Sequence, residues 1–170
     1  MNNILDSFGY ANRIFSNKKH NYTVVTKCAS SIIIDTLKMT EGKNDNAKSN
    51  FTFIRLPLAR IKSYLYQEKC FTEEETIHKI KSILHSFDGF NEHCVPYSFY
   101  INYDNFNLIG TLENFNNDFK NISKKKIIKE SRREDNKEVE EIHNASIKKY
   151  IEEISAVYGG DFRLYEKVTT

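Results

Sequence analysis

The sequence predicts a single α/β domain, residues 1–170, with a mostly parallel sheet flanked by helices. Two segments rich in strand-forming residues, 21–26 and 49–55, are each followed by a segment that can form a helix, 32–39 and 58–67. Parallel strands need a crossover connection, usually a helix, so this alternation predicts that the two strands pair in parallel. A chain of 170 residues can bury about two-thirds of its unfolded surface in one core.

The remaining elements follow from capping residues and periodicity. Thr72, followed by three glutamates, predicts an N-cap and an acidic first helical turn. Phe115 and Phe119 fall on one face of a short helix, and Gly159-Gly160 predicts a helix end. In order, we expect a loop over 40–50, a helix over 72–86, an irregular aromatic-rich segment over 87–103, a strand over 107–112, a short helix over 113–122, a solvated or mobile charged connection over 123–141, and a helix over 144–157.

Composition limits the classes of partner. Hydrophobic residues make up 39% and charged residues 28% of the chain, as in ordinary folded domains. The net charge of +2 comes from 25 basic and 23 acidic residues, which gives no general attraction to nucleic acid or to an anionic membrane. We therefore expect neither partner, and any anion site must be local.

Cysteine usage and the N-terminus predict the compartment. Cys28, Cys70 and Cys94 are odd in number and lack Cys-x-x-Cys spacing, which argues for reduced thiols rather than disulfides or a zinc site. The first ten residues lack a basic and apolar leader, and no run approaches the roughly 18 apolar residues of a membrane span. The expectation is a soluble cytoplasmic protein.

Two segments carry groups suited to phosphate. After the first strand, the run from Lys27 to Ser31 places hydroxyls and backbone N–H groups at a helix N-terminus, where the helix dipole favours an anion. The run is not a Walker A motif, and an ordinary capped helix is its alternative explanation. After the second strand, Arg55 offers a planar pair of donors, Pro57 suits the first helical turn, and Ser63 follows about two turns along.

Together these segments resemble the two-part nucleotide clamp of sulfotransferases that use 3′-phosphoadenosine 5′-phosphosulfate (PAPS), namely carbohydrate sulfotransferases of the Golgi and their bacterial relatives. The family's element Arg-x-Pro-x-x-Arg-x-x-Ser-x-Tyr is complete from Arg55 to Tyr64. Its loop Lys-x-Gly-x-Thr-Ser/Thr is matched at Lys27, Ser30 and Ser31, with Ala29 in place of Gly, a mild departure only if φ there is negative. Further matches in the same order are 91–96, 107–119 and 158–165.

The resemblance implies a P-loop-like sheet and assigns roles to residues. Lys27 would contact the phosphosulfate and neutralise the departing phosphate, and no metal is required. The residues that would hold the donor are Lys27, Cys28, Ala29, Ser30 and Ser31 at the 5′-phosphate, with Arg55 and Ser63 at the 3′-phosphate. Arg60 and Lys62 are expected as surface charges of the helix, although Arg60 matches the family pattern.

The acceptor requires a base, for which His93 is the first choice because imidazole titrates near neutrality. A packed, structural His93 is an equal alternative, and Glu92 and Glu113 are reserve candidates, although we favour a bracing role for Glu113 at the helix that follows it.

The predicted function is therefore sulfuryl transfer from PAPS to a hydroxyl acceptor, such as a saccharide or small alcohol, with 3′-phosphoadenosine 5′-phosphate (PAP) as the product. The alternative is a non-catalytic module that binds a nucleotide or sulfated ligand. A P-loop kinase lacks its Walker A signature here. Since the chain is short for this family, the elements that enclose the acceptor are either reduced or supplied by a second subunit of a homodimer.

Overall fold

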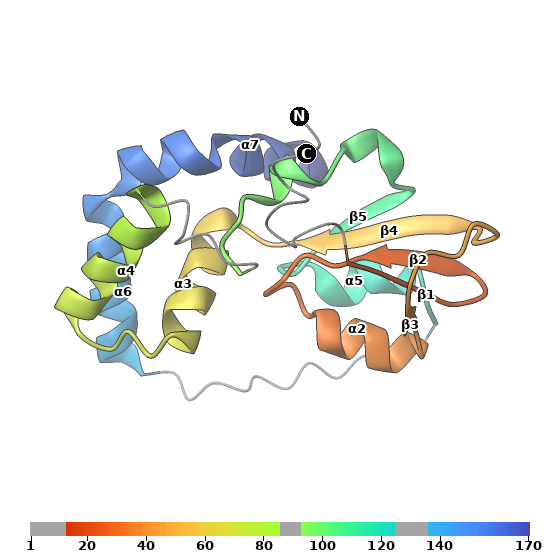
Figure 1. Ribbon diagram of the computed structural model, residues 1–170, viewed down its shortest axis with the longest axis horizontal. Helices are drawn as coiled ribbons and strands as arrows, with labels where there is room; N and C mark the ends of the chain where they lie inside the picture. The colour runs from red at the N-terminus through yellow and green to blue at the C-terminus, as the bar shows by residue number, and fades with distance from the viewer. Residues whose placement is uncertain (1–12, 86–92, 125–135) are drawn as a thin grey trace.

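A five-stranded mixed sheet forms the right-hand half of the molecule in Figure 1, in the strand order β3-β1-β2-β4-β5. The computed structural model describes residues 13–85, 93–124 and 136–170. The strands are β1 Ile14–Ser16, β2 His20–Thr23, β3 Thr40–Glu41, β4 Ser49–Ile54 and β5 Leu108–Thr111. The α/β class predicted from the sequence is confirmed.

The sheet is parallel in one part and antiparallel in the other. β4 pairs in parallel with β2, where Phe51 lies opposite Tyr22, and with β5, where Phe51 lies opposite Leu108. β1 pairs antiparallel with both β2 and β3. The expectation of a loop from residue 40 is wrong at its start, because Thr40–Glu41 pairs with β1. The strand predicted from residue 49 is confirmed, since β4 begins at Ser49.

Helices pack beside and beneath the sheet. They are α2 Ser30–Leu37, α3 Pro57–Gln67, α4 Glu73–His85, α5 Phe115–Lys120, α6 Lys137–Lys149 and α7 Ile151–Thr169, with short 3₁₀ turns η2 Tyr97–Phe99 and η3 Tyr103–Asn105. The predicted N-cap of α4 is confirmed: the Glu75 N–H donates to Thr72 Oγ1 at 3.3 Å, and Glu75 Oε2 accepts from the Thr72 N–H at 3.0 Å. This reciprocal pair is a capping box, which stabilises the first turn.

Two expectations for the C-terminal third are corrected. Part of the charged connection is helical, because α6 begins at Lys137 after Asn136 accepts a hydrogen bond from the Val139 N–H at 3.3 Å; residues 125–135 lie outside the described ranges. Gly159-Gly160 does not end a helix, since α7 continues to Thr169. A Cβ at Gly160 would lie 2.5 Å from Ser98 Oγ, so the absent side chain allows α7 to pack closely on η2.

The buried apolar residues form two clusters. One joins the sheet with α2, α5 and η2, and its members include Tyr22, Cys28 and Phe53. The other lies among α3, α4, α6 and α7, where Leu65 and Ile154 are buried, at the left of Figure 1. The parallel strands end between these clusters, since the arrowhead of β4 points toward α3.

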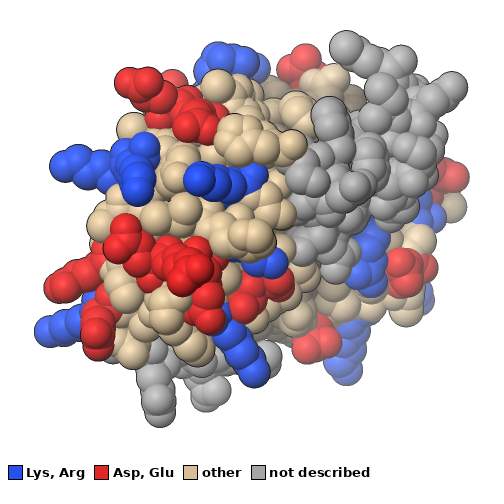
Figure 2. Space-filling view, turned by 60° about the vertical axis from the view of Figure 1, so that its left-hand side comes forward, with Lys and Arg blue, Asp and Glu red and all other residues tan. Residues whose placement is uncertain are grey.

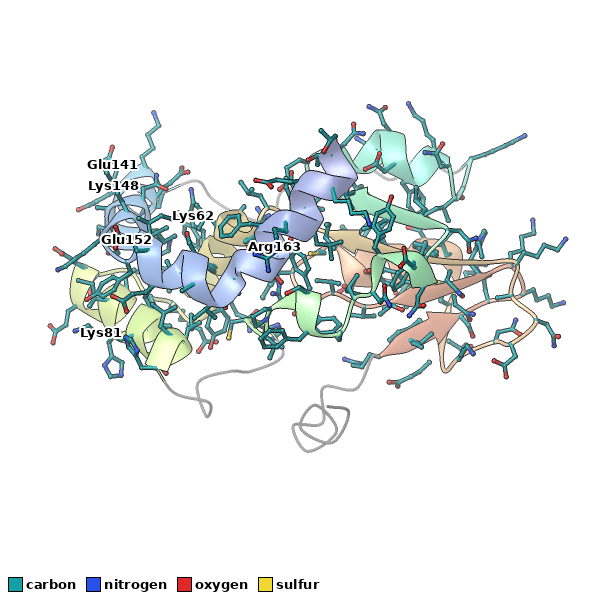
Figure 3. All side chains as sticks on the ribbon, turned by 90° about the horizontal axis from the view of Figure 1, so that it is seen from above. Lys62, Lys81, Glu141, Lys148, Glu152 and Arg163 are labelled. Atoms are coloured by element: carbon teal, nitrogen blue, oxygen red, sulfur yellow. The ribbon has the colours of Figure 1, made fainter. Side chains whose placement is uncertain are left out.

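The helical end of the molecule carries both signs of charge. Figure 2 shows acidic and basic side chains intermingled on this face. In Figure 3, Lys148 and Glu141 of α6 lie near Glu152 of α7, with Lys62 of α3 and Lys81 of α4 on the same end. No surface of a single sign is built there from described residues. Among the described helices, none has the length and apolar character needed to cross a membrane.

Candidate functional site

The carboxyl ends of β2, β4 and β5 bring three chemically active segments to one edge of the sheet. The run Lys27–Ser31 follows β2, Arg55 follows β4 directly, and Glu113 follows β5. Ile54 lies opposite Thr111 in the β4 and β5 pairing, so Arg55 and Glu113 leave the sheet side by side. Ligands of open α/β sheets bind at this end of the strands, which makes the edge the candidate site.

The loop before α2 has a backbone of alternating hand. Lys27 and Ala29 have φ of 65° and 61°, in the left-handed region, whereas Cys28 between them is not among the described residues of positive φ. Such alternation turns successive N–H groups toward one concavity that binds anions. No side chain caps the N-terminus of α2, whose N-cap is Ala29 itself. The loop therefore offers backbone donors and the positive end of a helix dipole.

Ala29 stands where the family's loop has Gly, and its backbone conformation costs free energy. Ala in place of Gly is a mild departure from the family's loop only if φ there is negative, and φ is 61°, so Ala29 is an obstacle to the resemblance. A residue with a Cβ in this region pays roughly 1–2 kcal/mol that Gly does not. Strain of this kind persists only where surrounding contacts hold it, and it concentrates at ligand sites.

The side chains of the loop hold its shape. Ser30 Oγ donates to the Val25 carbonyl at 3.0 Å and accepts from Tyr22 Oη at 3.1 Å, so this hydroxyl already has two partners within the protein. Ser31 is exposed at the start of α2, and Lys27 is half-buried. Cys28 is fully buried, and burial raises the pKa of its thiol to about 12, so the thiol packs in the core as a neutral group.

All three cysteines are free and buried. Within residues 13–85, 93–124 and 136–170, no three His, Cys, Asp or Glu side chains are grouped so as to hold a metal ion.

Arg55 and Glu113 form the second part of the site. Arg55 Nε lies 4.0 Å from Glu113 Oε1, and their side chains are 23% and 40% exposed. Glu113 Oε1 accepts the Leu56 N–H at 3.3 Å, and Glu113 Oε2 accepts the Tyr165 hydroxyl at 3.1 Å. Glu113 thus braces Arg55 and α7, not α5, whose N-cap is Asn114. The role favoured from the sequence, bracing the helix that follows Glu113, is therefore wrong.

Arg60 is not a surface charge but the largest fully buried side chain among the described residues, 1% exposed. Its Nη1 donates to the Val95 carbonyl at 2.7 Å, and its Nε donates to the Thr26 carbonyl at 3.3 Å. The guanidinium also stacks over the Tyr97 ring at 5.7 Å. Arg60 therefore joins the residue before the Lys27–Ser31 run to the segment that follows His93. Lys62 is half-buried and pairs with Glu140 at 3.7 Å.

Asp161 of α7 completes this buried network, and its role was not found from the sequence. Its carboxylate accepts the Tyr97 and Ser98 N–H groups at 3.0 and 2.8 Å, and lies 3.9 Å from Arg60 Nη1. Burial raises the pKa of Asp161 above its ordinary value, and the Arg60 charge opposes the rise. Its signals in the sequence were only the Tyr-x-x-Asp-Phe likeness and the two glycines before it.

His93 and Ser63 lie on the helical side of the site. Ser63 is buried one helical turn after Arg60 on α3, so both occupy one face. The His93 ring is 6.2 Å from the Tyr64 ring, tilted by 34°, and is half-buried. The following residue is fixed as well, because the Tyr158 hydroxyl donates to the Cys94 carbonyl. Glu92 lies outside the described residues.

The chain matches no protein-family model, no curated protein and no solved structure with which it was compared. The strand-end arrangement is therefore interpreted from its own chemistry. Its groups are backbone N–H donors of the loop, the half-buried Lys27 ammonium and the Arg55 guanidinium. All three favour an anion, and two cationic side chains on neighbouring strands suit a ligand with more than one phosphate.

Proposed function

We propose that the strand-end site binds a nucleotide carrying both 5′ and 3′ phosphates, and that the protein is a sulfotransferase using PAPS. The observation that carries the proposal is the loop of alternating hand from Lys27 to Ala29. This loop follows β2, which pairs with β4, the strand directly before Arg55. A backbone nest at one strand end and a guanidinium at the next fit two phosphates on one ligand. The P-loop-like character of the sheet belongs to this proposal.

The donor groups fit the charge of this ligand. PAPS supplies an activated sulfuryl group whose bond to the 5′-phosphate oxygen breaks as a bond to the acceptor oxygen forms. Lys27 neutralises the negative charge that grows on the departing phosphate, and the loop N–H groups hold its oxygens. Arg55, with Ser63, binds the 3′-phosphate. Glu113 is an opposing charge at this edge of the sheet, and its ion pair with Arg55 offsets it.

The acceptor is a hydroxyl compound, such as a saccharide or small alcohol, whose proton passes to a base as the new S–O bond forms. His93 remains our first choice for the base, because imidazole accepts a proton at neutral pH. Its position beside Tyr64 requires the acceptor to approach from the helical side. Glu113 is the second choice. A homodimer and a cytoplasmic location remain parts of the proposal.

Calorimetry with PAP, AMP and ATP tests the donor site. We expect PAP to bind most tightly, and Arg55→Ala to weaken PAP by about 2 kcal/mol, the scale of losing a charge-assisted contact, without changing the affinity for AMP. Lys19→Ala is a control that removes an exposed lysine of the β1–β2 turn. Equal affinity of the wild-type protein for PAP and AMP would overturn the assignment.

Transfer of labelled sulfate from PAPS to a panel of saccharides and alcohols tests catalysis separately. Transfer that requires Lys27 supports the enzyme. The assay is run at protein concentrations high enough for a dimer to form. Selective binding of PAP without transfer to any acceptor then supports the non-catalytic binding module instead.

A further inference from the structure

The contacts around Arg55 extend to the last helix of the chain. Glu113 approaches Arg55 through Nε, at 4.0 Å. That nitrogen is buried and has no hydrogen-bond partner among the described residues. The ion pair is made through Nε, so it restrains the guanidinium from one edge. The planar fork of the terminal nitrogens, which suits a phosphate, is left outside the ion pair.

The carboxylate of Glu113 is itself held from two sides. One oxygen accepts the Leu56 N–H, next to Arg55 in the chain, and the other accepts the hydroxyl of Tyr165 on α7. Burial and the nearby Glu113 charge raise the pKa of Tyr165 to about 12. The phenol therefore stays protonated at neutral pH and keeps donating to Glu113.

The position of Tyr165 is set by a buried anchor one turn earlier on the same helix. Asp161 is fully buried and accepts the N–H groups of Tyr97 and Ser98, which ties α7 to η2. Residues four apart on a helix share a face, so the anchor and Tyr165 address the same side of α7. A continuous series of contacts thus runs from η2 through α7 to the carboxylate beside Arg55.

We infer that Glu113 and Tyr165 are positioning residues for Arg55, and that α7 through them sets the preference for a 3′-phosphate. The inference rests on the proposed function, since it assigns the preference to Arg55. Holding a guanidinium in its binding orientation before the ligand arrives removes an ordering cost from binding. That gain is realised only with a ligand that reaches Arg55, which is PAP and not AMP.

The test measures the ratio of the dissociation constants for AMP and PAP by calorimetry at neutral pH. Tyr165→Phe removes one hydroxyl, and we expect the ratio to fall by about threefold to tenfold, the scale of one ordinary intramolecular hydrogen bond. Glu113→Gln removes the charge beside Arg55, and the ratio should fall at least as far. The affinity for AMP should not change in either variant, because AMP lacks the phosphate that meets Arg55.

Matched controls remove the same groups elsewhere. Tyr66→Phe deletes a hydroxyl that donates to the Asn136 carbonyl at 3.3 Å. Glu68→Gln deletes a carboxylate that pairs with Lys79 at 3.0 Å. Both should leave the ratio unchanged. A purely structural role for Tyr165 or Glu113 would lower the affinity for both nucleotides together, and thermal unfolding of each variant checks its fold.

The outcomes separate the two proposals. If the wild-type protein does not discriminate PAP from AMP, the proposed donor site fails and the inference fails with it. If it discriminates but Tyr165→Phe and Glu113→Gln match their controls, only the inference is overturned. A higher ratio in Glu113→Gln would also overturn it, because Glu113 would then act as a charge that repels phosphate. If Glu113→Gln does not fold, Tyr165→Phe alone decides.

Discussion

Replacement of Arg60 by methionine should destabilise the protein severely. Arg60 is 1% exposed and donates to the carbonyls of Thr26 and Val95. The variant leaves the buried Val95 carbonyl and the partly buried Thr26 carbonyl without this donor. It also leaves the buried Asp161 carboxylate, 3.9 Å away, without a counter-charge. Removing one partner of a buried ion pair costs about 3–5 kcal/mol. Methionine fills part of the volume, so we expect a loss within that range rather than above it.

Urea unfolding, followed by circular dichroism, measures this loss. Lys62→Met on the same helix is the control: its ammonium is partly exposed and pairs with Glu140 at 3.7 Å, a kind of contact that contributes about 0–1 kcal/mol. A loss below about 1 kcal/mol for Arg60→Met, or a loss equal to that of Lys62→Met, would refute the account of Arg60 as a buried bridge.

The pH dependence gives a second check on the same variant. Burial raises the folded-state pKa of Asp161 above 3.8, so the folded protein holds this proton more tightly than the unfolded chain does. The contribution of the group to stability is fully present below pH 3.8 and is lost as the pH rises through the raised pKa. Arg60 opposes the rise, so its removal raises this pKa further. The deficit of Arg60→Met against wild type should therefore shrink on acidification from neutral pH, and a constant deficit would contradict the pairing.

Three further predictions concern packing and catalysis. Gly160→Ala should destabilise the protein by about 1–2 kcal/mol in a thermal melt, because its Cβ would lie 2.5 Å from Ser98 Oγ; Gly159→Ala, with nothing nearer than 3.5 Å, should instead be neutral or stabilising. Lys27→Ala should lower kcat for sulfuryl transfer more than it raises the donor Kd, since charge grows on the leaving phosphate, and an unchanged kcat at saturating donor would contradict this role. His93→Ala should abolish transfer while PAP binding stays intact, and the wild-type rate should fall as acidification protonates the imidazole. If the variant folds and turns over normally, another residue is the base.

The amino-acid sequence by itself determines the elements whose signals are local. The strand, loop and helix units at β2–α2 and β4–α3 were predicted from strand-forming runs and Pro57, and the capping box of α4 was predicted from Thr72 and the glutamates after it. β1 and β3 were missed because three and two residues are too few to show a periodic pattern. Their pairing depends on backbone groups that meet only after the chain has folded.

At the candidate site, too, some features follow from the local sequence and others only from the tertiary structure. The sequence placed Arg55 at a strand end, because a residue directly after a strand stays at its end. Lys27 lies in the loop beyond β2, which ends at Thr23 and not at residue 26 as expected. The sequence could not show that Ala29 has a positive φ, since loop conformation depends on neighbours such as Tyr22 and Val25 that hold Ser30.

Only the tertiary structure decided the roles of the charged residues on helices. A helical arginine is expected in solvent, yet Arg60 is buried with the carbonyls of Thr26 and Val95 as partners. These partners lie 34 and 35 positions away in the chain, so no local sequence pattern reveals them. Two glycines predict a helix end, yet α7 continues through them because Gly160 packs on Ser98. Local propensity contributes about 1 kcal/mol at such positions, whereas burial of a charge or close packing of two elements contributes several times more.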